Sequence, residues 1–152
     1  MTVIRDARPA DYSDWRRLWA GYLAFYRVEL TEEVTADVWR RVLDPAASLF
    51  CRVAERDGGV IGFAVCVIHA GTWSPAPVCY LEDLFVDPAA RGAGAGAALI
   101  QDLIDRGGRE GWRRLYWHTH ADNQTARRLY DRFAAADGFV RYDIDLRPPA
   151  QV

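Results

Sequence analysis

The amino-acid sequence predicts one α/β (α+β) domain, residues 1–152, built on a single mixed central sheet. A length of 152 residues is typical of one domain. The composition, 51% hydrophobic and 26% charged, excludes a disordered or collagen-like chain. Segments with the alternating period of strands and segments with the period of helices follow one another in the order β-α-α-β-β-β-α-β-α-β.

The first half of the chain carries two helices and three strands. Aromatic residues recur at helical spacing from Tyr12 to Tyr26. Thr31, followed by two glutamates, is typical of a helix start, and the proline after Asp44 ends that helix. The Asp57-Gly58-Gly59 segment between two apolar runs predicts a hairpin. The expected elements are a strand at Thr2–Asp6, helices at 12–26 and 31–44, and strands at Leu49–Ala54 and Val60–Ile68.

The second half alternates strands and helices. An apolar strand at Val78–Val86 ends at Asp87-Pro88, and a glycine-rich turn leads into an amphipathic helix. We expect Gly107-Gly108 and Gly111 to end that helix. The remaining expected elements are a strand at Leu115–Thr119, a helix capped by Asp122 or Asn123, and a last strand at Phe139–Leu146, where apolar and charged residues alternate.

The net charge and the cysteine content indicate which classes of partner and which cellular compartment to expect. The net charge is −2 and the pI is about 5.9, which gives no reason to expect nucleic acid. Three separate cysteines, Cys51, Cys66 and Cys79, fit buried thiols in a reducing compartment. We find neither a signal-like N-terminus nor an apolar run long enough to span a membrane, so we expect a cytoplasmic protein without a membrane partner.

The turn Arg91-Gly92-Ala93-Gly94-Ala95-Gly96 carries the clearest chemical signal. Its small residues expose backbone N–H groups at the start of a helix, a site that favours phosphate. Three interpretations are open: a turn without a ligand, a dinucleotide site, and a site for the pyrophosphate of an acyl-coenzyme A. The dinucleotide pattern expects such a turn after the first strand of a βαβ unit, and here it follows the fourth predicted strand. All 19 basic residues are arginine, so the lysine of a nucleoside-triphosphate loop is missing.

Several motifs in a consistent order resemble one family. The glycine turn matches R-x-x-G-x-G/A, and Asn123, Ala126, Leu129 and Tyr130 match N-x-x-A-x-x-L-Y. From about Val3 to Leu146 the chain thereby resembles the GNAT N-acetyltransferase superfamily. Within it, the chain resembles the yeast histone and polyamine acetyltransferase subgroup and the diamine acetyltransferases.

The resemblance implies a GNAT-like fold with about six to seven strands, splayed between strands 4 and 5, and about four flanking helices. It also implies acetyl-coenzyme A bound in the splay. The residues implied to bind it are Leu84, Phe85, Val86, Arg91, Gly92, Ala93, Gly94, Ala95, Gly96, Asn123 and Ala126.

The implied reaction is direct acetyl transfer to a primary amine in a ternary complex. Tyr130 is implied as the acid that protonates the departing thiolate, and Glu82 as the base that deprotonates the amine. Asp83, on the opposite face of its strand, and a water chain are competing bases. The rival interpretation is a non-catalytic acyl-coenzyme A-binding sensor or interaction module on the same fold. His118 and His120 lack a third ligand at suitable spacing, so we expect no metal.

The acceptor and the assembly are less constrained. Polyamines, aminoglycosides, small amines, peptide N-termini and protein lysines all remain open as acceptors. The acidic residues Glu29, Glu32, Glu33 and Asp37 form either a solvated helix start or a rim that attracts a cation. A homodimer is expected from the exposed edges of the last strands. About four residues more than the family pattern separate Tyr130 from Gly138-Phe139.

Overall fold

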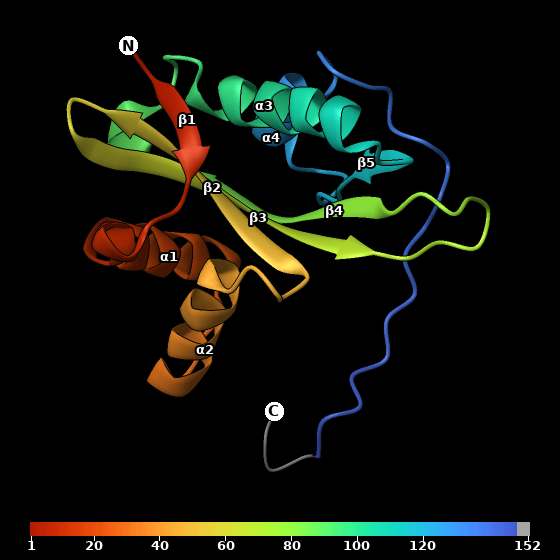
Figure 1. Ribbon diagram of the computed structural model, residues 1–152, viewed down its shortest axis with the longest axis horizontal. Helices are drawn as coiled ribbons and strands as arrows, with labels where there is room; N and C mark the ends of the chain where they lie inside the picture. Colours follow the sequence, from red (N-terminus) through yellow and green to blue (C-terminus); the bar gives the residue numbers. More distant parts are fainter. Residues whose placement is uncertain (149–152) are drawn as a thin grey trace. The chain divides into compact units, whose positions relative to one another are not determined.

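The structure is a computed structural model that describes residues 1–148 (Figure 1). It consists of two compact units, Met1–His118 and the residues from Thr119 onward, and each is described by itself. The first unit contains β1 (Val3–Asp6), η1 (Pro9–Asp11), α1 (Tyr12–Tyr26), α2 (Glu32–Leu43), β2 (Leu49–Arg56), β3 (Gly59–His69), β4 (Val78–Val86), η2 (Pro88–Ala90), α3 (Ala95–Glu110) and β5 (Arg114–Tyr116). The second unit contains α4 (Gln124–Tyr130).

One mixed sheet organises the first unit and confirms the predicted fold class. Its strand order is β1-β2-β3-β4-β5. The first three pairings are antiparallel, and β4 pairs with β5 in parallel. Helices α1 and α2 lie on one face of the sheet and α3 lies on the other (Figure 1).

The sheet has five strands instead of the six or seven expected, because Phe139–Leu146 is not a strand in the described chain. The apolar residues of this segment are highly exposed, from 73% at Val140 to 91% at Tyr142. Alternation supplies the period of a strand, but a strand also needs a neighbouring backbone to accept and donate its hydrogen bonds. The second unit contains only α4 and irregular chain among its described residues, so this segment finds no partner strand there.

Local sequence signals set most element ends. The Thr31 hydroxyl accepts from the backbone N–H of Val34 and caps α2. The β2–β3 hairpin turns through Asp57 and Gly58, both with positive φ, as a two-residue turn of this kind requires. The expectation for Gly107-Gly108 is wrong, because α3 continues through both to Glu110, but the expectation for Gly111 is confirmed, because Gly111 caps the helix with a φ of +73°. A side chain at Gly107 would place its Cβ 2.8 Å from the Trp112 ring, so close packing accounts for the glycine.

An aromatic core lies between α1 and the sheet. The Trp15 and Trp19 rings stack at 5.2 Å, and the Trp39 ring of α2 lies 4.8 Å from Trp15. On the sheet side, Phe63 packs against Trp19 at 6.0 Å. Burial of such large side chains is the dominant favourable contribution to folding, and here it fixes α1 across β3 and β4.

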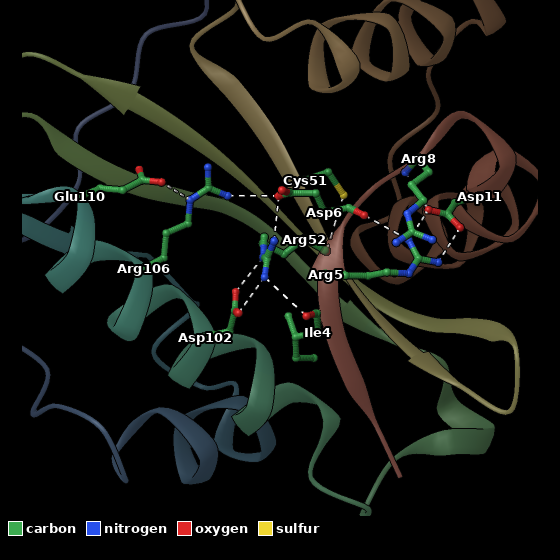
Figure 2. Close-up of polar contacts among 10 residues, drawn as sticks. All are labelled: Ile4, Arg5, Asp6, Arg8, Asp11, Cys51, Arg52, Asp102, Arg106 and Glu110. Atoms are coloured by element: carbon green, nitrogen blue, oxygen red, sulfur yellow. Dashed lines mark hydrogen bonds and ion pairs between the residues drawn. The ribbon is translucent and has the colours of Figure 1, made fainter.

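Arginine–carboxylate pairs join β1, β2 and α3 on the other side (Figure 2). Arg52 of β2 donates to both carboxylate oxygens of Asp102 in α3, at 2.7 and 2.8 Å, and to Asp6 at 2.8 Å. Arg106 of α3 bridges Asp6 and Glu110. Bidentate pairs of this kind are geometrically specific, so they fix the position of α3 along the strands.

A second pair ties β1 to the start of α1. The Arg5 guanidinium donates to both oxygens of the buried Asp11 carboxylate, at 2.7 and 2.8 Å, and the Arg8 backbone N–H donates to it at 2.7 Å. The Arg5 hydrogen bonds, opposed by burial and assisted by Arg8, hold the pKa of Asp11 below its usual value. Because the folded pKa is depressed, this contribution to stability is present above the usual pKa and is lost as the pH falls through the folded value.

We therefore predict that Asp11→Asn lowers the free energy of unfolding by about 1–3 kcal/mol at pH 7, because charge-assisted hydrogen bonds are lost. The difference between variant and parent should shrink toward pH 3. Urea unfolding of both proteins at pH 7 and at pH 3 measures this difference in the free energy of unfolding. Asp57→Asn, in the exposed hairpin turn, is the matched control and should change little. An Asp11→Asn deficit that persists unchanged at pH 3 would contradict the electrostatic explanation.

Candidate active site

The sheet opens between β4 and β5. β4 pairs with β3 along its length, but β5 pairs only with Val78, Cys79 and Tyr80. Beyond Tyr80, no other strand of the described chain pairs with this edge of β4. The backbone groups of residues 81–86 that point away from β3 therefore lack a ladder partner. The splay expected between strands 4 and 5 is confirmed, and Leu84, Phe85 and Val86 lie along its open edge.

The glycine turn follows directly on this edge. Gly92 and Gly94 have φ values of +83° and +84°, which L side chains rarely adopt. Gly94 is the N-cap of α3, and no side chain caps the helix in its place. A Cβ at either glycine would meet no atom within 4 Å, so the space above the turn is open. Ala95 is buried and anchors the helix, while residues 91–94 are exposed, and the first-turn N–H groups of α3 are available to an anion.

Arg91 and α1 shape the surroundings of the turn. The Arg91 Nε donates to the Val86 carbonyl at 3.0 Å, and its guanidinium lies 5.3 Å from the Phe85 ring centroid. A Cβ at Gly21 would lie 3.0 Å from the Phe85 ring, so glycine allows α1 to approach this closely. A cavity of about 240 Å³ lies here, lined by Arg17, Leu18, Gly21, Phe25, Phe85, Asp87, Pro88 and Arg91.

A β-bulge at Glu82 sets which side chains of β4 face α1. Val65 pairs with Asp83 and Cys66 pairs with Leu81, so Glu82 is an extra residue without a partner in the register. Glu82 is exposed, whereas Asp83 shares the face of the α1 core with its partner Val65. Tyr80, which pairs with Val67, lies on that same face. Without the bulge, Tyr80 and Asp83 would lie on opposite faces.

Asp83 is a half-buried carboxyl group that accepts a hydrogen bond from the Tyr22 hydroxyl. Burial raises the pKa of Asp83 to about 6, although the hydrogen bond from Tyr22 opposes the rise and the charge of Glu82 adds to it. Burial and the Asp83 charge raise the pKa of Tyr22 in turn, so its hydroxyl stays protonated. Tyr22 is one of the aromatic residues that recur at helical spacing along α1, and periodicity alone does not show its polar role.

The second unit holds the remaining predicted residues. Asn123 caps α4, with its side-chain oxygen accepting from the Ala126 N–H at 3.2 Å. Tyr130 is the last residue of α4 and is half-buried. Part of the insertion after it forms one further turn, since the N–H groups of Phe133 and Ala134 donate to the Tyr130 carbonyl. The structure brings Leu84–Val86 and the glycine turn together in the first unit, and Asn123, Ala126 and Tyr130 together in the second.

The acidic stretch is partly neutralised by arginine. Arg16 pairs with Glu32, and Asp37 pairs with Arg40 and Arg41. Across residues 1–148, no group of three or more His, Cys, Asp or Glu residues is arranged to hold a metal ion. No helix in this part of the chain is long and apolar enough to cross a bilayer.

Residues 13–135 match the model of the Acetyltransferase (GNAT) family. The chain belongs to the GNAT acetyltransferase family. This GNAT enzyme is 32% identical over 142 residues to the D-amino-acid N-acetyltransferase HPA3 of Saccharomyces cerevisiae, covering 92% of this chain and 88% of that protein. It is 30% identical over 145 residues to the uncharacterized N-acetyltransferase YhfO of Bacillus subtilis, covering 94% and 97%.

Solved structures share the fold of this GNAT acetyltransferase. AAC(6')-Iy, in complex with the bisubstrate analog CoA-S-monomethyl-acetylneamine, superposes with a TM-score of 0.77 at 23% identity, covering 95% of this chain and 99% of that chain. The family uses acetyl-coenzyme A as its acetyl donor. These findings confirm the predicted family and the predicted N-acetyltransferase class of enzyme.

We predict that Gly94→Ala raises the Kd for coenzyme A about tenfold, because an alanine at φ +84° is strained by roughly 1–2 kcal/mol and shifts the N–H groups of the turn. Isothermal titration calorimetry measures the Kd. Gly108→Ala is the matched control, since this glycine is helical and a Cβ there meets no atom within 4 Å. Equal affinities for Gly94→Ala and the parent would contradict an anion site at the turn.

Proposed function

We propose that the protein transfers an acetyl group directly from acetyl-coenzyme A to a primary amine in a ternary complex. One observation carries the proposal: the unpaired edge of β4 runs into a glycine turn with positive φ angles at the N-terminus of α3. An extended ligand with amide groups fits the strand edge, and a pyrophosphate at its end fits the turn.

The donor would be held mainly by backbone groups. Leu84, Phe85 and Val86 would bind its amide-containing arm through the free edge of β4, and the turn from Gly92 to Gly96 would bind its pyrophosphate, with Arg91 adding charge. Asn123 and Ala126 of α4 are proposed to contact the same arm, on the strength of the family motif. When bound, acetyl-coenzyme A supplies the thioester carbonyl that an amine attacks. A backbone N–H near Phe85 or Val86 would donate to the oxygen of that carbonyl as negative charge develops on it.

The structure supports Asp83 over Glu82 as the group that takes the proton from the amine. A free alkylamine has a pKa near 10.4 and must lose a proton before it attacks. Asp83 is half-buried beside Tyr22 with a pKa of about 6, so it is ionised at pH 7 and keeps an appreciable proton affinity. Glu82 projects from the bulge and is exposed. Tyr130 is proposed to protonate the departing thiolate, which rests on its match to the family helix motif.

The acceptor class, the assembly and the compartment are proposals as well. HPA3 is named for acetylation of D-amino acids, which makes amino acids a first acceptor class to test. We infer a homodimer from the exposed apolar residues of 139–146, which are suited to cover one another. Three free, buried cysteines support a cytoplasmic protein.

The first test is coenzyme A thiol release from acetyl-coenzyme A over a panel of D- and L-amino acids, polyamines, aminoglycosides and peptides. We expect Tyr130→Phe to lower turnover at least tenfold while the Kd for acetyl-coenzyme A is nearly unchanged. Tyr142→Phe, at an exposed position, is the control. Unchanged turnover in Tyr130→Phe would remove this residue from the mechanism. Binding of acetyl-coenzyme A without release with any amine would favour the sensor or interaction module.

The second test concerns Asp83. We expect kcat of the parent to fall as the pH drops through about 6. Asp83→Asn should lower kcat at least tenfold and should abolish this dependence of kcat on pH. Because the folded pKa is raised, burial of the carboxylate costs stability at neutral pH, so Asp83→Asn should raise Tm at pH 7.5 and lose this gain below pH 4. Glu82→Gln is the matched variant. A larger loss of kcat in Glu82→Gln than in Asp83→Asn would make Glu82 the base.

A further inference from the structure

A cluster of tyrosine and histidine side chains lies on the α1 side of the sheet, beyond the end of α1. Val67 and His69 of β3 pair with Tyr80 and Val78 of β4, and Tyr80 pairs in turn with Tyr116 of β5, so their side chains share one face. Phe85 and Asp83 lie on the same face farther along β4. In Figure 1, β5 and the adjoining ends of β3 and β4 lie to the right of α1 and α2.

The members of this cluster contact one another closely. The Tyr80 and Tyr116 rings lie 4.8 Å apart, and the Tyr80 hydroxyl lies 3.1 Å from His118 Nδ1. The Tyr116 hydroxyl lies 2.8 Å from His69 Nε2, and His69 Nδ1 lies 2.9 Å from the Ala70 carbonyl. A carbonyl only accepts, so His69 Nδ1 donates to Ala70, and this hydrogen bond orients the ring with Nε2 toward the Tyr116 hydroxyl. The cluster thus consists of polar rings that contact one another and are partly exposed.

Arg114 adds a positive charge to the same face. It pairs with Val78 in the register, yet its guanidinium lies 4.6 Å from the centroid of the Tyr116 ring, two residues farther along β5. Because β4 and β5 are parallel, this conformation moves the charge from the level of Val78 to the level of Tyr80, toward the open part of the sheet. Arg114 is exposed, and no carboxylate within residues 1–148 forms an ion pair with it.

We propose that Tyr80, His118 and Arg114 recognise a carboxylate on the acceptor, so that the acceptor is an amino acid whose amine faces Asp83. This inference rests on the proposed function. Moving along the face from Asp83, the groups change from a carboxylate to hydroxyl and imidazole donors and then to a guanidinium. That order is complementary to a molecule with an amine at one end and a carboxylate at the other.

The distances along the strand are suitable for a small zwitterion. Tyr80 and Asp83 pair with Val67 and Val65, which are two residues apart on β3, so they are separated by about 7 Å along the strand direction. The Arg114 guanidinium lies over the ring of Tyr116, which is the register partner of Tyr80. A planar guanidinium binds a carboxylate through two parallel hydrogen bonds. An acceptor that carries a carboxylate should therefore bind more tightly here than one with a neutral or cationic group at the same place.

The test compares leucine of both configurations with 3-methylbutan-1-amine, which is leucine without its carboxylate. We expect the parent enzyme to have a kcat/KM at least tenfold higher for one leucine enantiomer than for the amine. Arg114→Gln and His118→Gln should each raise KM for that leucine at least fivefold, with kcat within about twofold and KM for the amine unchanged. Arg113→Gln is the matched control, because Arg113 is also exposed and directly precedes β5.

A binding measurement separates this inference from the proposed function. Calorimetric titration of N-acetylleucine into the protein with coenzyme A present requires no turnover. We expect Arg114→Gln to weaken this binding at least fivefold relative to the parent. If the enzyme acetylates amines but Arg114→Gln changes KM equally for leucine and for 3-methylbutan-1-amine, carboxylate recognition is contradicted. The proposed acetyltransferase function would stand in that case. Binding that depends on Arg114 without any turnover would support recognition and contradict the proposed reaction.

Discussion

The candidate site depends on the unequal pairing of β4 with its two neighbours. β3 pairs with it from Val78 to Val86, but the parallel pairing with β5 ends at Tyr80. A strand in the interior of a sheet normally has both of its edges occupied, and an unpaired edge is a template for another extended molecule. The first unit therefore presents an open strand edge in its interior while the opposite edge is fixed by the antiparallel ladder. The glycine turn and α3 follow this edge directly in the chain, so a ligand on the strand would be continuous with one at the helix N-terminus.

The bulge at Glu82 is the second decisive feature of β4. It shifts the alternation by one residue and brings Tyr80 and Asp83 to the face of α1. Burial of the Asp83 carboxylate under α1 is unfavourable when it is ionised, and the aromatic packing of Trp15, Trp19 and Phe63 compensates elsewhere in the same core. A group of raised pKa is thereby held on a rigid strand and not on a mobile loop. The ion pairs of Arg52 and Arg106 fix α3 on the other side of the sheet.

Much of the fold was predictable because its signals are local. Thr31, the Asp57-Gly58 turn and the glycines at 92 and 94 act through their own backbone conformations and nearest neighbours, and each lies where the sequence indicated. The strand expected at Phe139–Leu146 is wrong for a nonlocal reason, since alternation does not reveal whether a partner strand is present. The helix end predicted at Gly107 is wrong because this glycine is required for close packing against the Trp112 ring and not for ending the helix. The roles of Glu82, Tyr130 and the donor-binding residues remain predictions.

The sequence by itself determined the family, the glycine turn and the order of elements, because motif spacing and local backbone conformation depend on residues that are close together in the chain. Only the tertiary structure decided that Asp83 faces the core under α1 while Glu82 is exposed, since a bulge depends on the register of two strands. It also decided that His69, Tyr80, Tyr116 and His118 come together, although they span residues 69 to 118. Contacts between distant segments follow from strand pairing and helix packing, which a local pattern does not contain.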